Sequence, residues 1–213
     1  MTWLYLDLDG PLLDVSDRYH RVHCEIVRSL GGEPRLDRIA YWARKRDAQG
    51  AAALAAAEGL AEEARRYLER WLDRIETDDA LAWDALQPDA PTVLATLAAR
   101  RRVALVTLRQ NRAGLERELD RFEIRSHLEA VLSASPVGVH GARTKQALIS
   151  DSGLPTDGAW LVGDTEIDVR AARLLGIRAA AVTCGIRSEA RLRRESPDLI
   201  VPDLVSAVDT LLA

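Results

Sequence analysis

Two aspartates near the start of the chain, Asp7 and Asp9, have the type and spacing of a metal-dependent phosphate or acid–base site. They follow the apolar run 3–6, which predicts a buried strand that ends at the turn residue Gly10. Because side chains alternate along a strand, both carboxylates leave it on the same side. Converging carboxylates repel each other unless a cation lies between them, and hard divalent cations prefer oxygen ligands. The simpler interpretation is that Asp and Gly only close a strand.

Two further polar residues lie at predicted element ends. Thr107 ends the apolar run 103–107, and ligands of open α/β sheets bind beyond the carboxyl ends of the strands. Lys145, one of only two lysines beside Lys45, lies near the start of a predicted helix, where the backbone already favours an anion. The alternatives are a threonine that merely ends a strand and a lysine exposed on a helix.

A second acidic pair, Asp164 and Asp168, follows the predicted strand 159–162 and is spaced by one helical turn. Asp164 could instead cap the next helix, and Asp168 could pair with a neighbouring arginine on a solvated face. Single motifs of this kind often have such structural explanations. Their occurrence together, in this order along one sheet, favours a site for a metal and a phosphate.

The elements that must position these residues fall into two patterns. Residues 15–83 show apolar side chains at helical spacing without a strand pattern, which predicts an inserted helical segment. From Pro88 onward, apolar strands alternate with amphipathic helices, which predicts a parallel sheet covered on both faces. Strands are predicted at 103–107, 130–133, 159–162, 179–183 and 199–201, and helices after Asp89, at 112–121, after Thr144, and at 167–175, 189–195 and 204–212.

Composition and charge exclude several classes of protein. A net charge of -4 gives no basic surface for nucleic acid, so no nucleic-acid partner is expected. No apolar run reaches membrane-spanning length and no signal peptide is recognisable, so no membrane partner is expected. Cys24 and Cys184 form no close pair and suggest reduced thiols in the cytoplasm. The sequence does not indicate an oligomeric state.

With these motifs in view, the chain resembles the haloacid dehalogenase superfamily, in its phosphoglycolate-phosphatase-like group with a helical cap. The matching stretches are D-L-D-G-P-L-L-D at 7–14, V-A-L-V-T at 103–107, Lys145, and G-D-T-E-I-D at 163–168. The resemblance covers the whole chain. It implies a Rossmann-like α/β core at 1–13 and 87–213 with an α-helical cap inserted at 14–86.

The resemblance also implies a role for each matching residue. Asp7 would be the nucleophile that forms an aspartyl-phosphate, and Asp9 the general acid and base; spacing alone leaves either aspartate as the attacking group. Magnesium would be held by Asp7, the Asp9 backbone carbonyl and Asp164, with Asp168 as a direct or indirect ligand. Thr107, Leu108 and Lys145 would form the phosphate-binding set.

Several positions depart from the pattern of the superfamily. Pro11 follows Gly10 and stiffens the exit toward the cap. Leu108 stands where relatives often carry Asn, so a side-chain contact with phosphate is expected to be missing, and Arg109 or Asn111 would be the nearest replacements. Arg143 is a weaker candidate than Lys145 for the same duty.

The resemblance implies a magnesium-dependent phosphatase acting on a small phosphomonoester. Asp9 argues against a dehalogenase or a phosphonoacetaldehyde hydrolase, which lack an acid there. A sugar phosphomutase of the same superfamily and a non-enzymatic phospho-acceptor or sensor are the alternatives.

In the cap, polar residues could face the substrate, although a solvated helix face is the commoner position, and three tryptophans are expected to pack the cap's own core. The polar residues are Arg18, His20, His23, Arg44, Lys45 and Arg46, and the tryptophans are Trp42, Trp71 and Trp83.

Overall fold

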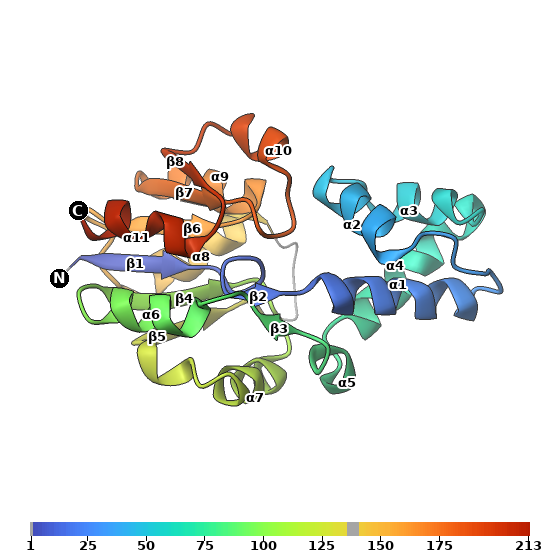
Figure 1. The fold of residues 1–213 in the computed structure, drawn as a ribbon, viewed down its shortest axis with the longest axis horizontal. Coiled ribbons are helices and arrows are strands. Elements are labelled where there is room, and N and C mark those ends of the chain that lie inside the picture. Colours follow the sequence, from blue (N-terminus) through green and yellow to red (C-terminus); the bar gives the residue numbers. More distant parts are fainter. Residues whose placement is uncertain (1, 136–140) are drawn as a thin grey trace. The chain divides into compact units, whose positions relative to one another are not determined.

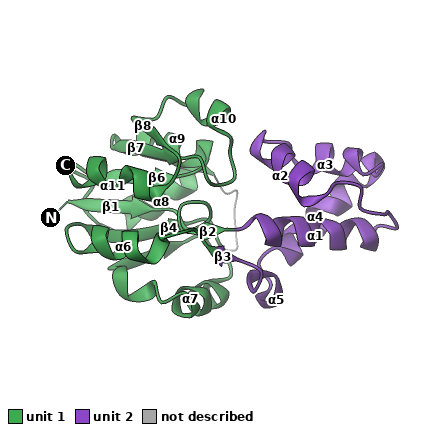
Figure 2. Ribbon diagram, in the orientation of Figure 1, with its two compact units in different colours: residues 1–14, 86–213 green, residues 15–85 purple. Residues whose placement is uncertain are grey.

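The computed structural model describes residues 2–135 and 141–213. By its contacts the chain divides into two compact units, one formed by residues 1–14 and 86–213 and the other by residues 15–85 (Figure 2). The short strands β2 (Leu13–Asp14) and β3 (Ala85–Leu86) pair with each other at the two points where the chain passes between the units. None of the helices described has the length and apolar character needed to cross a membrane.

The first unit is built on a parallel sheet of six strands in the order β5-β4-β1-β6-β7-β8 (Figure 1). β1 lies near its centre, with Leu6 opposite Leu105 of β4 on one side and Val162 of β6 on the other. Every side chain of β1 is buried, as expected for a strand covered on both faces. The predicted α/β class is therefore confirmed. The strands are β1 (Trp3–Leu6), β4 (Arg102–Thr107), β5 (Ala130–Ser133), β6 (Trp160–Gly163), β7 (Arg178–Val182) and β8 (Leu199–Val201).

Helices cover both faces of this sheet. α8 (Ala142–Asp151) and α9 (Glu166–Leu175) pack on each other and on the face that carries Trp3 and Tyr5 of β1. α6 (Ala90–Ala98) and α11 (Leu204–Leu212) pack on each other, and α6 contacts β4. The remaining helices of this unit are α7 (Arg112–Arg121), α10 (Glu189–Arg193) and the short 3-10 turn Arg125–His127.

Helix ends are where the sequence predictions and the structure differ most. α8 begins at Ala142, so Thr144 lies inside its first turn and the prediction that Thr144 caps the helix is wrong. Asp89 does precede α6, but it adopts a left-handed backbone (φ 60°) and its side chain makes no capping hydrogen bond. Gly176 ends α9 in the left-handed conformation (φ 68°), as predicted.

The second unit is entirely helical between β2 and β3. Its core joins apolar residues of several helices, and Trp42, Trp71 and Trp83 pack against that core, which confirms their predicted structural role. The helices are α1 (Ser16–Ser29), α2 (Arg38–Arg46), α3 (Ala51–Ala57), the 3-10 turn Ala61–Glu63, α4 (Ala64–Arg74) and α5 (Asp78–Leu81).

Two polar residues of α1 lie in this core and not on a solvated face, which corrects the expectation for Arg18 and His23. Arg18 Nε lies 3.0 Å from Asp84 Oδ1, and both side chains are almost fully buried. His23 is 0 % exposed and lies between Glu58 and Tyr67, with Nε2 at 2.8 Å from Glu58 Oε1 and Nδ1 at 2.7 Å from the Tyr67 hydroxyl. Buried polar groups of this kind are tolerated only when they are paired.

The partners of Glu58 decide the protonation of His23. Glu58 accepts the backbone N–H groups of Arg35 (2.7 Å) and Leu36 (3.1 Å). Burial opposes its ionisation, but these amides and His23 outweigh burial and hold the pKa of Glu58 below its usual value. Burial lowers the pKa of His23. A neutral His23 that donates from Nε2 to Glu58 and accepts at Nδ1 from Tyr67 satisfies all three side chains.

The helical unit should therefore lose stability as the solution is acidified below the ordinary histidine pKa of about 6.5. The folded form of His23 binds protons less readily than the unfolded form, so lowering the pH favours unfolding, by about 1.4 kcal/mol for each unit of pKa difference. Melting temperatures measured by tryptophan fluorescence from neutral pH down to moderately acidic pH check this. His23→Gln, which keeps one donor and one acceptor, should flatten the dependence, and His127→Gln should leave it unchanged.

Candidate active site

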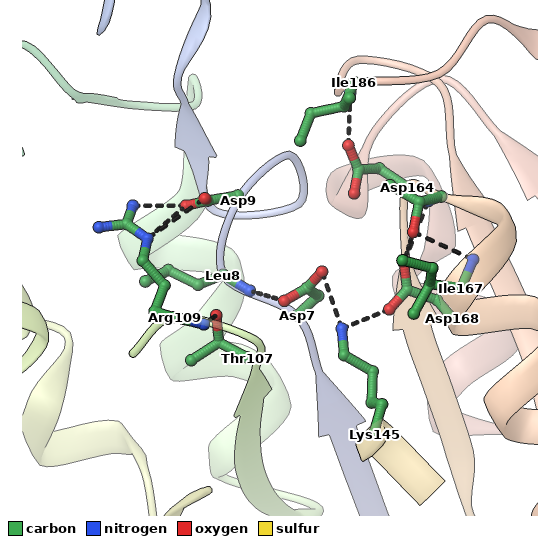
Figure 3. Close-up of polar contacts among 11 residues, drawn as sticks. Asp7, Leu8, Asp9, Thr107, Arg109, Lys145, Asp164, Ile167, Asp168 and Ile186 are labelled. Atoms are coloured by element: carbon green, nitrogen blue, oxygen red, sulfur yellow. Dashed lines mark hydrogen bonds and ion pairs between the residues drawn. The ribbon is translucent and has the colours of Figure 1, made fainter. Parts of the chain in front are cut away.

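Three polar residues lie at the carboxyl ends of three neighbouring strands. Asp7 follows β1, Thr107 ends β4, and Asp164 follows β6, the strands that flank β1 on its two sides. Because the strands are parallel, their carboxyl ends meet at one edge of the sheet, and these side chains lie there together (Figure 3). Asp7 and Asp164 are within reach of a common ion.

Lys145 of α8 joins two carboxylates at this edge. Its Nζ lies 2.9 Å from Asp7 Oδ2 and 2.5 Å from Asp168 Oδ1, and the side chain is 1 % exposed. The other Asp7 oxygen, Oδ1, accepts the backbone N–H of Leu8 at 2.8 Å. The alternative of an exposed helix-start lysine is therefore wrong for Lys145. Arg143, the weaker candidate for the phosphate-binding role of Lys145, is exposed.

Asp168 is occupied on both oxygens. Oδ1 binds Lys145, and Oδ2 accepts the backbone N–H (3.0 Å) and the hydroxyl (2.7 Å) of Thr165 in a capping box at the start of α9. The alternative that Asp168 pairs with an arginine on a solvated face is wrong, because its side chain is buried. Asp168 thus holds Lys145 against the first turn of α9.

Asp164 is 0 % exposed and only half satisfied. Its Oδ2 accepts the backbone N–H of Ile186, whereas Oδ1 has no hydrogen-bond partner among the described residues. Thr165, and not Asp164, is the N-cap of α9. A buried carboxylate oxygen left without a donor is a position where a cation is expected.

The charges at this edge do not balance. Burial raises the pKa of Asp7 to about 7, and burial together with the charges of Asp168 and Asp7 raises the pKa of Asp164. Burial alone would lower the pKa of Lys145, but the charges of Asp168 and Asp7 outweigh it and raise that pKa. Three ionised carboxylates around one ammonium leave two negative charges, which a divalent cation would neutralise.

At three backbone positions beside Asp164 and Asp168, a side chain larger than that of glycine would overlap a carboxylate. A Cβ added to Gly10 would lie 2.2 Å from Asp164 Cγ, and one added to Gly185 would lie 2.0 Å from Asp164 Oδ2. A Cβ added to Gly163 would lie 2.1 Å from Asp168 Cγ.

The carboxylates of Asp7, Asp164 and Asp168 each offer an oxygen within 4.8 Å of the others. This donor set fits a magnesium ion, which prefers carboxylate oxygens.

Asp9 is directed elsewhere. Its carboxylate does not belong to the cluster of three but points at the guanidinium of Arg109, which donates from Nε at 3.1 Å and from Nη2 at 2.5 Å (Figure 3). Arg109 in turn donates from Nη1 to Glu118 Oε2 at 2.7 Å. A metal contact of Asp9 through its backbone carbonyl, as the resemblance implies, remains a prediction.

The segment after β4 holds the other predicted phosphate ligands. The Thr107 hydroxyl accepts the backbone N–H of Arg109 at 3.3 Å, which leaves its own proton available to a ligand. Asn111 is used locally, because its side chain caps α7 through the N–H of Gly114 at 2.9 Å. Leu108 is half-buried and its role as a phosphate contact remains a prediction.

Sequence reasoning missed the residues that support the site. Ile186 supplies the amide for Asp164, Gly185 supplies the space beside it, and Thr165 anchors Asp168. Glu118, which orients Arg109, lies nine residues further along the chain. Only Gly185, which follows the predicted strand 179–183 closely, carries a signal in the sequence, since glycine at such a place often permits a close approach.

Open α/β sheets bind ligands beyond the carboxyl ends of their strands, and in this chain an acidic, lysine-containing cluster lies there. Residues 4–182 match the family described as haloacid dehalogenase-like hydrolase, and the chain belongs to that family.

Relatives place the chain among the phosphatases of this family. It is 30% identical over 148 residues to a phosphoglycolate phosphatase of Synechococcus elongatus, an alignment covering 67% of this chain and 69% of the relative. It is 34% identical over 176 residues to a phosphoserine phosphatase of Thermus thermophilus, covering 80% and 67% respectively. Among solved structures, a haloacid dehalogenase-like hydrolase of Streptococcus pneumoniae superposes with a TM-score of 0.81 at 21% identity, covering 99% of this chain and 98% of the other.

Gly185→Ala should disrupt the cluster through Asp164. The added methyl group would overlap the carboxylate, so we expect a loss of about 1–3 kcal/mol of stability and a displaced Asp164 side chain. A thermal melt with and without magnesium measures both effects, because a cation that binds the folded form raises the melting temperature. Gly141→Ala, where no atom of the described residues lies within 4 Å of the added carbon, is the matched control. An unchanged magnesium-dependent shift in Gly185→Ala would contradict the role given to Asp164.

Proposed function

We propose that this chain is a magnesium-dependent phosphatase that hydrolyses a small phosphomonoester through an aspartyl-phosphate on Asp7. The observation that carries the proposal is the convergence of Asp7, Lys145 and the half-satisfied Asp164 at one edge of the sheet. Family membership supports the reaction class. The inserted unit 15–85 would be the cap of such an enzyme.

In the first half-reaction a carboxylate oxygen of Asp7 attacks phosphorus. The bond between phosphorus and the ester oxygen breaks, and the departing alkoxide takes a proton from the Asp9 carboxyl group, giving the free alcohol and the aspartyl-phosphate. The contacts of Asp7 with the Leu8 amide and Lys145 fix the direction of its carboxylate, so that the attacking oxygen is held in one geometry.

In the second half-reaction the Asp9 carboxylate takes a proton from a water molecule as the water oxygen attacks phosphorus. The bond between phosphorus and Asp7 then breaks, which releases inorganic phosphate and restores both aspartates. The same residue thus acts as acid and then as base.

Charge stabilisation would come from three groups. The ammonium of Lys145 and the hydroxyl of Thr107 would hold the transferring phosphoryl oxygens. Asp7 and Asp164 would hold magnesium, with Asp168 acting chiefly on Lys145 because both of its oxygens already accept hydrogen bonds. When bound, the metal supplies neutralisation of the negative charge that the acidic cluster and the phosphate share.

The substrate class is a small anionic phosphomonoester. The names of the two relatives suggest phosphoglycolate and phosphoserine as the first compounds to test. A cap that excludes water during the reaction would favour small substrates.

Phosphate release from a panel of small phosphomonoesters, with magnesium and with a chelator, tests this proposal. We expect turnover that is lost on chelation and restored by magnesium. Asp7→Asn should lower kcat/KM by at least about 10³-fold, because it removes the nucleophile. Asp73→Asn, a change at an exposed acid of α4, should leave the rate unchanged.

Other outcomes point to other functions. Transfer of phosphate between positions of one sugar, without net release, would indicate a phosphomutase. A stable aspartyl-phosphate without turnover would indicate a phospho-acceptor or sensor. Folded protein that binds magnesium but shows neither reaction nor labelling of Asp7 would overturn the proposal.

A further inference from the structure

We propose that Arg109 is a positioning residue for Asp9: together with Glu118 it fixes the carboxyl group that donates the proton to the leaving oxygen. The inference rests on the proposed function and deepens it. The proposed mechanism gives Arg109 no role as nucleophile, metal ligand or phosphate ligand, and this inference assigns it one.

The contact between Arg109 and Asp9 is a two-point contact. Nε of Arg109 lies 3.1 Å from Asp9 Oδ1 and 3.2 Å from Oδ2, and Nη2 lies 2.5 Å from Oδ1. A guanidinium that engages both oxygens defines the plane of the carboxylate as well as its position. A lysine could not do this, since its ammonium is a point charge.

The guanidinium of Arg109 is itself held in place by a second acid, Glu118. Arg109 is 4 % exposed, and its Nη1 donates to Glu118 Oε2, a side chain of α7 that is 3 % exposed. The backbone N–H of Arg109 donates to Thr107 at the end of β4. Arg109 therefore joins β4 and α7 to the loop after β1, and its geometry has little freedom to change.

Burial distinguishes this pair from an ordinary surface ion pair. Surface pairs contribute little and vary in geometry, whereas a buried arginine between two acids is held by charge and by packing. Glu118 compensates part of the guanidinium charge, so the arginine is paired whether Asp9 carries a proton or has given it up.

The leaving group provides a way to isolate this duty. An alkoxide leaves only when it receives a proton, whereas 4-nitrophenolate leaves without one. If Arg109 acts through Asp9, its loss slows formation of the aspartyl-phosphate from alkyl esters and spares 4-nitrophenyl phosphate. A contact between Arg109 and the phosphoryl group would affect both esters equally.

The experiment compares kcat/KM of Arg109→Gln and wild type on two esters, with magnesium present. One is the fastest of 2-phosphoglycolate, phosphoserine and glucose 6-phosphate, and the other is 4-nitrophenyl phosphate. We expect a loss of about 10- to 100-fold on the alkyl ester, a part of the roughly 10²–10⁴-fold that a positioned acid supplies. We expect about threefold or less on the aryl ester.

A second comparison asks whether the effect passes through Asp9. In an Asp9→Asn background, Arg109→Gln should change kcat/KM for the alkyl ester by less than about twofold. The reason is that the asparagine has no acidic proton to donate, so its position no longer matters for proton transfer. Full additivity of the two substitutions would overturn the inference.

Folding is controlled in two ways. Arg109→Gln removes the shorter of the two ion pairs of buried Glu118 and leaves only Arg121, at 3.5 Å, so the double variant Arg109→Gln/Glu118→Gln is measured beside it. Arg112→Gln, three residues along and exposed, is the matched control and should leave the ratio between the two esters unchanged.

The outcomes separate the two proposals. Wild-type protein that releases phosphate from no ester overturns the proposed function and this inference with it. Wild-type protein active on both esters, with equal losses on both in Arg109→Gln and in the double variant, overturns the inference alone. A loss confined to the alkyl ester supports both.

Discussion

The organisation of the core depends on one electrostatic constraint, an excess of buried negative charge at the carboxyl edge of the sheet. Asp7, Asp164 and Asp168 share a region that is nearly closed to solvent, and the Lys145 ammonium is bound directly to Asp7 and Asp168. Isolated charges in such a place would be neutralised by protonation. The packing of α8 on α9, the capping box of Thr165 and the glycines beside Asp164 all serve to hold this arrangement.

The two aspartates of the first motif have different electrostatic surroundings, although only Leu8 separates them. Asp7 lies among acids and one lysine, and burial raises its pKa. Asp9 lies against an arginine that is backed by a second acid. Environments that differ in this way assign different duties to chemically identical groups. Spacing along a strand does not distinguish the two carboxylates, whereas their surroundings do.

The sheet and the location of the cluster could be predicted because they follow from periodicity and strand ends. Asp7, Thr107 and Asp164 each follow an apolar run, and parallel strands bring such positions to one edge. The Asp9–Arg109 contact could not be predicted, because it depends on side-chain rotamers across 100 residues of sequence. Helical spacing does not reveal a buried partner such as Asp84 or Glu58, so it wrongly predicts a solvated face for Arg18 and His23.

The central position of β1 has a consequence for how the chain folds. Its partners lie far along the sequence, since Trp3 is opposite Arg102 and Leu4 is opposite Trp160. During synthesis this apolar strand emerges long before either neighbour, with the whole of residues 15–85 made in between. Both edges of β1 stay unpaired over that interval, and contacts of such long range are slow to form. The helical insertion, whose contacts are local, can complete its own core first, so the nascent chain carries a folded module ahead of an unfinished sheet.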